Sequence, residues 1–299
     1  MTVINTNTAA NITANALTKN ERAMSQAMER LSTGQRINSA GDDAAGLAIS
    51  SRMTSQINGL NMAVRNANDA ISMVQTADGA LVESTNMLQR MRELAVQSVS
   101  GTMSSTDRSA LNTEYMALAA ELERIAQNTQ WNGTDLLDNT PGNGGSVTFH
   151  VGANASQTVA VDFGDFTQAS GSFANFLTGG SAGTTAAAIG GDKALYDTDL
   201  SGDIATSYIN TAIGVIDTAI TAVNSQRATF GAAINRLEYA ADNLSNVSQN
   251  TSASRSRILD ADYASETTEL ARTQIIQQAA TAMLSQANQQ AQSVLALLK

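Results

Sequence analysis

The chain has 299 residues, of which 4% are aromatic, one is proline and none is cysteine, and its formal net charge is −10. The missing cysteines exclude disulfides and thiolate chemistry, and the acidic balance argues against a nucleic-acid partner, which would require a basic face. No stretch approaches the roughly 18 apolar residues of a membrane span, so no membrane partner is expected. The N-terminus lacks the basic start and apolar run of a cleaved secretory signal, so we expect a protein that stays in the cytoplasm or leaves by another route.

The first predicted element is an amphipathic helix near the N-terminus. Its apolar stripe consists of Leu17, Met24, Met28 and Leu31, at spacings of 7, 4 and 3 residues. An apolar stripe on a helix must be covered by something, and each large side chain so buried gains about 1.5–3 kcal/mol.

The second predicted element is a long helix with a sustained heptad pattern between residues 49 and 95. Gly41 gives a stop and Asp42 and Asp43 give an N-cap just before it, so we expect the helix to run from Ala44 to Val99. A helix of that length is about 80 Å long and is typical of coiled-coil-like packing.

Charged residues interrupt the apolar seams of the long helices. Asp78 and Arg92 occupy seam positions here, and Arg227 occupies one on a later helix. Two hypotheses stay open: these side chains lie at seam edges and extend to water, or they fix the register between helices at some cost in stability.

A third helix and a β-hairpin are predicted next. Ser104 and Asp107 form a capping box that opens a helix, which the segment 128–133 closes. Apolar and polar residues then alternate over 147–151 and 159–163, which predicts a hairpin. The following residues are rich in Gly, Ser, Thr and Ala, and we interpret them as a small outer elaboration.

Two further helical patterns complete the chain. A heptad pattern covers residues 209–244, and the last stretch carries a stripe of Ile276, Ala280, Met283, Ala287, Ala291, Val294 and Leu298. Within that stripe Ile276, Ala287 and Leu298 are 11 residues apart, a spacing typical of a nearly straight helix. Because both ends carry stripes, we predict that the termini meet each other and then meet copies of the chain.

No constellation of residues supports catalysis or metal binding. The only histidine, His150, falls on a predicted strand, and the serines have no histidine partner for triad chemistry. The segment that begins with Asp197 and Asp199 resembles the first half of a calcium-binding loop, but the twelfth position of that loop would be Tyr208 instead of glutamate. We therefore expect a protein that is not an enzyme and that has no catalytic residue, cofactor or metal.

Several motifs, in the right order, resemble bacterial flagellin. They are Val3–Asn7, Leu31–Ser50, Arg65–Ile71, Leu88–Ser98, Gln130–Gly133, Ser254–Tyr263 and the stretch from Gln286 onward. The resemblance covers roughly residues 1–150 and 205–299 and implies a secreted, self-assembling subunit of the extracellular flagellar filament, used in swimming motility. It also implies partners: copies of itself, an export chaperone and type III export apparatus, the filament cap and the hook-associated proteins.

The resemblance further implies a receptor site. Flagellins sensed by Toll-like receptor 5 carry a pattern that is matched here by Gln89, Arg90, Leu94 and Glu114. It also implies assembly through the terminal helices, with Leu17, Met24, Met28, Leu31, Ile276, Met283, Ala287, Val294 and Leu298 as the assembly residues.

The predicted fold is mainly α with a small β part: a long, coiled-coil-like helical rod formed by N- and C-terminal segments, with a hairpin and a variable outer region. We divide the chain into a filament-core domain (1–42 and 254–299), an inner rod (43–152 and 204–253) and a hairpin return strand with a variable surface region (153–203). Two alternatives stay open, a hook–filament junction protein and a cytoplasmic coiled-coil adaptor, and an enzyme is a distant third.

Overall fold

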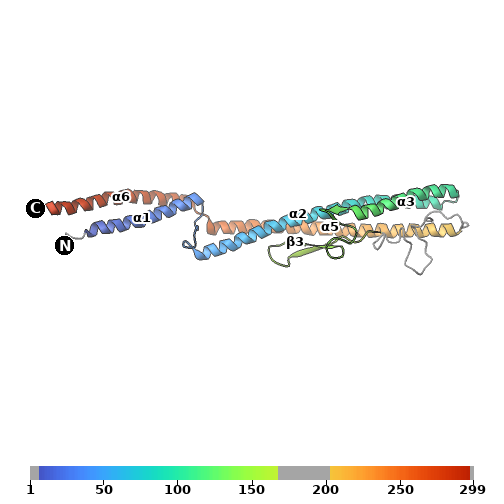
Figure 1. Cartoon of the computed structure of the whole chain (residues 1–299), viewed down its shortest axis with the longest axis horizontal. Coiled ribbons are helices and arrows are strands. Elements are labelled where there is room, and N and C mark those ends of the chain that lie inside the picture. Colours follow the sequence, from blue (N-terminus) through green and yellow to red (C-terminus); the bar gives the residue numbers. More distant parts are fainter. Residues whose placement is uncertain (1–6, 168–202, 297–299) are drawn as a thin grey trace. The chain divides into compact units, whose positions relative to one another are not determined.

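A computed structural model describes residues 7–167 and 203–296 of the chain (Figure 1). The chain divides into two compact units: unit 1 comprises residues 1–57 and 248–299, and unit 2 comprises residues 58–247. The calcium-like loop at Asp197 and most of the predicted outer elaboration lie outside the described residues. The fold is mainly helical with short antiparallel strands, as predicted.

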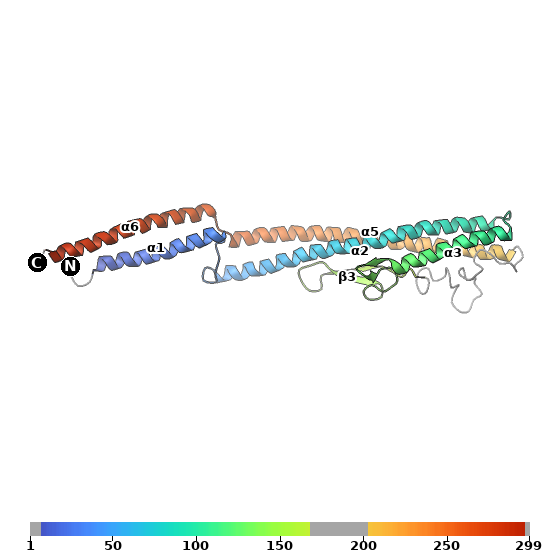
Figure 2. The same cartoon turned by 45° about the horizontal axis from the view of Figure 1, so that its top comes forward.

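In unit 1, helix α1 (Thr8–Thr33) packs antiparallel against helix α6 (Tyr263–Ala296). Figures 1 and 2 show the two helices side by side, with the start of α1 beside the C-terminal part of α6. Asn7 caps α1 by accepting a hydrogen bond from the Ala10 amide, and Gly34 ends it in the left-handed conformation, with φ at 71°. The prediction that the terminal helices meet is confirmed.

Helix α2 spans Ala44–Val99, so its predicted bounds are confirmed. The segment between α1 and α2 supplies its N-cap. The Asp43 carboxylate accepts a hydrogen bond from the Gly46 amide at 2.8 Å, as an N-cap does. A Cβ atom on Gly46 would lie 2.5 Å from the Asp43 carboxylate and 2.6 Å from Ile37 Cδ1, so any larger residue here would force these side chains to shift. Ile37 is buried beneath the turn.

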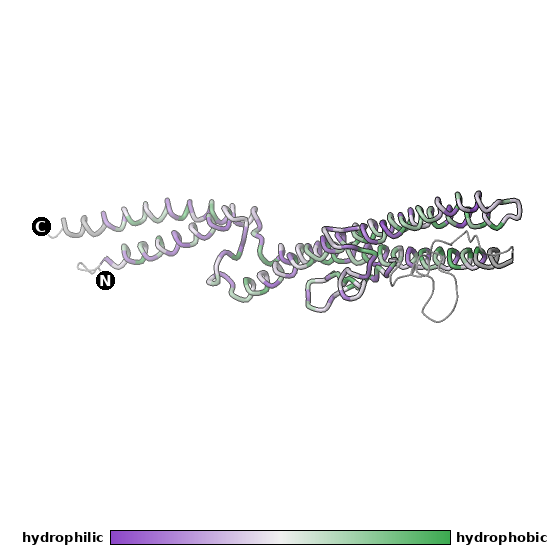
Figure 3. Tube along the Cα trace, turned by 45° about the vertical axis from the view of Figure 1, so that its right-hand side comes forward, coloured by the Kyte–Doolittle hydropathy of each residue, from purple (hydrophilic) through white to green (hydrophobic). Residues whose placement is uncertain are grey.

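Unit 2 has a continuous apolar core between α2, helix α3 (Ser105–Asn128), helix α5 (Asp203–Leu259) and the strands. Hydrophobic residues recur along α2 and α5 in Figure 3. The largest side chains that are fully buried in this unit are Leu81, Leu88, Met91, Leu94, Tyr115, Leu122, Leu136, Phe163 and Phe230. Since each contributes about 1.5–3 kcal/mol, this core supplies most of the unit's stability.

Helix α5 is longer than the heptad pattern predicts. The apolar repeat covers residues 209–244, whereas the helix continues to Leu259 through a Ser- and Asn-rich stretch. Contact with α2 supports this extension, because the Arg255 guanidinium donates to the Thr54 hydroxyl at 3.3 Å. Tertiary contact therefore sustains helix where local apolar periodicity has ended.

The predicted capping box and hairpin are both present. Ser104 and Asp107 cap α3 reciprocally, and the short strands β1 (Gln130–Trp131) and β2 (Thr134–Asp135) follow it. Strands β3 (Ser146–His150) and β4 (Thr158–Asp162) pair antiparallel, with Phe149 opposite Val159. The hairpin packs on the core of unit 2, where the Phe163 and Phe230 rings lie 5.5 Å apart.

The charged seam residues form ion pairs between α2 and α5. Arg227 Nε lies 2.8 Å from Asp78 Oδ1, and Arg92 Nε lies 2.7 Å from Asp217 Oδ1. Each pair is one-third to one-half exposed, so each contributes only about 0.2–1 kcal/mol. Their pairing across two antiparallel helices favours the hypothesis that these residues fix register.

Candidate functional site

The side chains that are fully buried where α1 and α6 meet are small or polar. Asn20, Ala27 and Thr273 are buried there, and the Asn20 amide donates to the Thr273 carbonyl at 2.7 Å. Asn7 donates to the Ala287 carbonyl at 3.1 Å. Sequence periodicity missed Asn20 and Thr273 because they are not apolar, yet each lies seven residues before an alanine of the same face, which is a heptad signal.

Five large apolar side chains of this helix pair are instead exposed. The exposed fractions are 68% for Ile12, 54% for Met28, 66% for Ile275, 39% for Ile276 and 60% for Met283. In Figure 3 α1 carries scattered hydrophobic residues among hydrophilic ones. Nothing in the described part of unit 1 covers this apolar area.

The predicted assembly residues therefore fall into three groups. Leu17, Met24, Leu31 and Ala287 are half-buried between the helices, and Met28, Ile276 and Met283 are exposed. Val294 lies on α6, but its side chain is outside the described residues, as is the whole of Leu298.

The register of the pair brings part of the exposed group together. The bonds from Asn7 to Ala287 and from Asn20 to Thr273 show that each step forward along α1 is matched by a step back along α6, so Ile12 lies level with residues 281–282, within one helical turn of Met283. Ile12, Ile276 and Met283 each precede a half-buried position by one residue, which is a rotation of about 100° out of the contact face. In an antiparallel pair of helices, residues that precede the contact positions by one on either helix point to the same side of the pair. We call Ile12, Ile276 and Met283 the terminal flank.

Polar contacts fix the other end of the helix pair. Arg30 Nη1 lies 3.2 Å from Glu266 Oε1, with side chains only 26% and 13% exposed. The Arg36 amide donates to the Leu259 carbonyl at 2.7 Å, and the Ala261 amide donates to the Gly34 carbonyl at 3.0 Å. The two connecting segments are thus joined by a backbone bridge, which holds the helices in register.

The predicted receptor residues lie on α2 and α3 of unit 2. Gln89, Arg90 and Glu114 are exposed, and Arg90 lies 2.9 Å from Glu114 and 3.0 Å from Glu93. Hydrogen bonds from Arg90, to Glu114 first and to Glu93 second, raise the pKa of Arg90 above its ordinary value.

Leu94 differs from the other receptor residues, because its side chain is completely buried in the core of unit 2. Leu88 and Met91, six and three residues before it, and the neighbouring Ala95 are buried as well, so residue 94 lies on the core face of α2. Only Gln89, Arg90 and Glu114 present a surface that a partner could touch directly.

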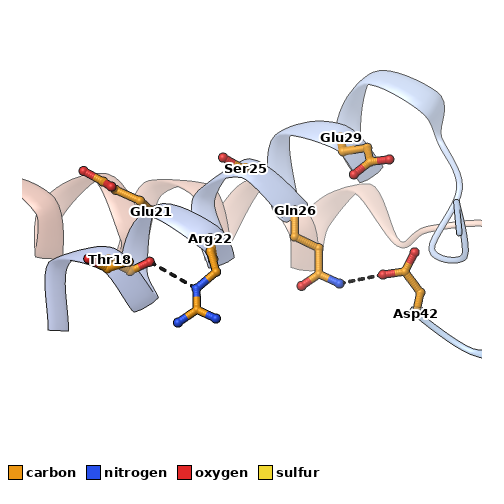
Figure 4. A pocket seen from close by; sticks show the side chains of 7 residues that line it. All are labelled: Thr18, Glu21, Arg22, Ser25, Gln26, Glu29 and Asp42. Atoms are coloured by element: carbon orange, nitrogen blue, oxygen red, sulfur yellow. Dashed lines mark hydrogen bonds between the residues drawn. The ribbon is translucent and has the colours of Figure 1, made fainter. Parts of the chain in front are cut away.

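An open groove of about 430 Å³ lies on the exposed side of α1, beside the loop that carries Asp42 (Figure 4). The Gln26 amide donates to Asp42 at 2.8 Å. The Ser39 backbone amide, and after it the Ser39 hydroxyl, hold the pKa of Asp42 below its ordinary value, so this carboxylate is ionised at neutral pH. The groove is polar and chemically unlike the terminal flank.

Other chemistry finds little support in the described part of the chain. No group of three or more potential metal ligands occurs among residues 7–167 and 203–296. His150 is exposed at the end of β3, with its carbonyl accepting from Asn66. No helix within those ranges combines the length and apolar character needed to cross a bilayer.

The two ends of the chain match two family models. Residues 4–141 match the bacterial flagellin N-terminal helical region, and residues 213–298 match the bacterial flagellin C-terminal helical region. A flagellin of Bacillus subtilis is 43% identical over 312 residues, covering 99% of both chains. A flagellin of Halalkalibacterium halodurans is 45% identical over 276 residues, covering 92% of this chain and 91% of the relative.

A solved structure is similar in fold. The putative flagellar hook-associated protein from Vibrio parahaemolyticus superposes with a TM-score of 0.58 over 73% of this chain and 100% of that chain, at 14% identity. At that identity the likeness concerns the fold alone.

Proposed function

This chain belongs to the bacterial flagellin family, whose members are structural subunits of the flagellar filament and not enzymes, and from that premise we propose that its terminal helix pair is the assembly surface. The observation that carries the proposal is the exposure of Ile12, Met28, Ile275, Ile276 and Met283 on a pair whose inner face holds Asn20, Ala27 and Thr273. A second copy that covers the terminal flank gains about 1.5–3 kcal/mol for each large side chain it buries.

Assembly is coupled to the ordering of the terminal helices in this proposal. Residues 1–40 are rich in Ala, Asn and Thr, and an isolated helix of such composition is marginal in water. The inner face of the pair buries little apolar surface completely, since Ala27 is the only fully buried apolar residue of α1 and Leu17, Met24 and Leu31 are only half-buried. The helices therefore gain most of their stability when copies meet.

A truncation tests the proposal. Deleting residues 290–299 should abolish filaments of the purified protein in negative-stain micrographs, while unit 2, reported by Trp131 fluorescence, still unfolds cooperatively. A finer test changes Ile276 and Met283 to Ser, with exposed Gln278→Ser and Gln286→Ser as a matched control. Normal filaments from the truncation, or equal effects from both pairs, would contradict the proposal.

The same premise supports export and capping partners. We propose that the chain leaves the cell through the flagellar type III apparatus, held beforehand by a cytoplasmic chaperone, and is added under a filament cap next to hook-associated proteins. Recovery of the intact protein from culture medium, lost in a strain without the export apparatus, tests this. Retention in the cytoplasm would favour a coiled-coil adaptor.

Two observations distinguish a filament subunit from a hook–filament junction protein. A major filament subunit is abundant, and its purified monomer grows long filaments. Nearly full-length identity of 43% to a flagellin supports the filament role. Short, sparse assemblies would favour the junction role instead.

Recognition by Toll-like receptor 5 is a second candidate function. It is supported by an exposed surface on which Glu114 and Glu93 hold the Arg90 guanidinium. Arg90→Ala and Glu114→Ala should each lower receptor signalling without changing the unfolding of unit 2, and Arg124→Ala on α3 is the matched control. Leu94→Ala is a poor probe, because it opens a cavity in the core. Intact signalling by the Arg90 and Glu114 variants would refute this function.

A further inference from the structure

Sulfur is present in this chain only as the methionine thioether. The chain has 11 methionines and no cysteine, and every methionine except Met1 lies in the described residues. Oxidation converts a thioether to a sulfoxide, which turns a flexible apolar side chain into a polar one. Because the oxidant has to reach the sulfur atom, the exposure of each side chain decides which methionine reacts first.

The methionines differ widely in exposure. Met28, Met62 and Met283 are exposed, Met283 most of all, whereas Met91 is completely buried and Met73 nearly so. The other described methionines are half-buried, and they are Met24, Met53, Met87, Met103 and Met116. Met28 and Met283 lie on the terminal helix pair, and Met62 lies on α2 in unit 2. Two of the three exposed thioethers therefore lie on the proposed assembly surface.

The side chains around Met283 on α6 leave its sulfur open. Residues three and four positions away on a helix are neighbours on its surface. For Met283 these neighbours are Ala279, Ala280, Gln286 and Ala287. Three of the four are alanines, which are too short to cover a thioether. Across the pair Ile12 lies within one helical turn, and Ile276 lies seven residues before Met283 on the same flank. Met283 is thus an open thioether on the terminal flank.

We propose that Met283 is an oxidation site that controls assembly of the subunit. The oxidant is a peroxide: with hydrogen peroxide the O–O bond breaks, an S–O bond forms, the sulfur loses two electrons and water leaves. The thioether is restored when two thiols of a reductase are oxidised to a disulfide and the oxygen leaves as water. The proposal rests on the filament role proposed above, because it requires a second copy to cover the terminal flank.

The sulfoxide opposes assembly because its oxygen is a hydrogen-bond acceptor that water solvates on the free subunit. Covering that oxygen removes its water, and the flank supplies no donor in return, since Ile12 and Ile276 are apolar. Oxidation of the free subunit breaks no core contact, because Met283 is exposed there. It should therefore weaken assembly without unfolding the subunit. In a filament the flank is covered, so Met283 should react slowly once the subunit has been added.

The first measurement is the rate of oxidation at each methionine. The purified subunit and preformed filaments are treated with dilute hydrogen peroxide, and peptide mass spectrometry measures the sulfoxide at each position. In the subunit Met283 should react at least about tenfold faster than Met91, which needs local opening to react. In filaments Met283 should react at least about tenfold more slowly than in the subunit. A reaction of Met283 as slow as that of Met91, or equally fast in subunit and filament, would overturn the proposal.

Leucine variants test the effect on assembly, because leucine has about the volume of methionine and does not react with peroxide. The starting variant carries Met28→Leu, so Met283 is the one exposed methionine left on the described part of the terminal helix pair. Peroxide should raise its critical concentration for filament growth at least about tenfold, which is the factor that losing the burial of one large apolar side chain costs. Adding Met283→Leu should hold that rise below about threefold, whereas adding Met62→Leu, the matched control, should not protect.

Recovery checks that the sulfoxide itself is responsible. A thiol-driven methionine sulfoxide reductase should return the oxidised Met28→Leu variant to its untreated critical concentration. Sedimentation and negative-stain microscopy measure that concentration. Circular dichroism and Trp131 fluorescence check that the oxidised protein and the variants stay folded.

Failure of the oxidation site and failure of the filament role give different results. If the untreated protein polymerises and protein with the sulfoxide at Met283 polymerises equally well, the oxidation site is wrong and the filament role stands. The same conclusion follows if Met283→Leu gives no protection, or if the reductase removes the sulfoxide without restoring growth. If the untreated protein forms no filament, the proposed function fails and this oxidation site fails with it.

Discussion

The core of unit 2 and the terminal helix pair of unit 1 bury different kinds of residue. In unit 2 the buried side chains are large and apolar, such as Leu88, Tyr115 and Phe230. On the α1–α6 pair of unit 1 the fully buried side chains are Asn20, Ala27 and Thr273, and large apolar residues such as Ile12 and Met283 face outward. Both units use long antiparallel helices, so the difference lies in which side chains occupy the contact face.

The difference shows that stabilising the subunit and presenting a surface for assembly are assigned to different parts of one chain. Unit 2 has a core that stabilises the subunit by itself, whereas the terminal pair has only a narrow contact face and leaves its apolar surface for another partner. A polymerising protein benefits from this division, because a subunit whose assembly surface were already covered could not add to a filament. Four predictions test the comparison, in order of decreasing expected effect.

The largest effect should come from the core of unit 2. Leu88→Ala should lower the free energy of unfolding by about 2–5 kcal/mol, since Leu88 is completely buried. Met283→Ala should change it by less than about 0.5 kcal/mol, since Met283 is 60% exposed. Urea unfolding followed by Trp131 fluorescence and circular dichroism measures both. Similar losses at the two positions would break the comparison.

The next largest change in the free energy of unfolding should come from a buried hydroxyl in unit 2. Tyr115 is fully buried and its hydroxyl has no hydrogen-bond partner among the described residues, so Tyr115→Phe should raise the free energy of unfolding by about 1–3 kcal/mol. Burial also raises the pKa of Tyr115 well above its ordinary value of 10.0. The folded state therefore disfavours the phenolate, and stability is full below pH 10 and falls as the pH rises beyond it.

The Phe variant should lack that part of the alkaline loss, which urea titrations at a series of pH values would measure. Tyr239→Phe is the control, because Tyr239 is 77% exposed. A Tyr115→Phe variant that is less stable than wild type at neutral pH would show that the hydroxyl has a partner.

A smaller effect is expected at the polar face of the terminal pair. Asn20→Ala removes the bond to the Thr273 carbonyl and should cost about 0.5–1.5 kcal/mol of local stability. Hydrogen exchange of the α1 amides measures it. Exposed Asn11→Ala corrects for the higher helix propensity of alanine. Unchanged exchange for the Asn20 variant would mean that the face depends on apolar contact after all.

The smallest effect should come from the ion pairs of unit 2. A double-mutant cycle on Asp78 and Arg227 should give a coupling of about 0.2–1 kcal/mol that weakens with added salt. Such a value would mean that the pair is not a main source of stability, which is what the one-third exposure of both side chains leads us to expect. A coupling above about 3 kcal/mol would place it among the main stabilising contacts of the unit.

Most of the helices and the hairpin could be predicted from sequence. The N-cap at Asp43 and the capping box at Ser104 are local signals, because a side chain there bonds to a backbone amide three residues away. The alternation in the hairpin is local as well. The continuation of α5 to Leu259 was not predictable, because contacts with α2, distant in sequence, support it.

The candidate sites were predictable in part. Motif resemblance pointed to Gln89, Arg90, Leu94 and Glu114, but it could not indicate that Leu94 lies in the core while the others are exposed. The polar groove on α1 left part of its signal in the sequence, because six of its seven lining residues recur at three- and four-residue spacings on α1, whereas Asp42 comes from the following loop.

By itself the sequence determined the family, the long helices and the presence of apolar stripes at both ends of the chain. Only the tertiary structure decided the phase of those stripes: Ala280 and Ala287 face α1, while Ile276 and Met283 of the same stripe lie on the flank. The physical reason is that helical periodicity gives the spacing of a face but not its direction. Direction depends on the partner helix, and here Asn20 and its bond to the Thr273 carbonyl, 253 residues away, set it.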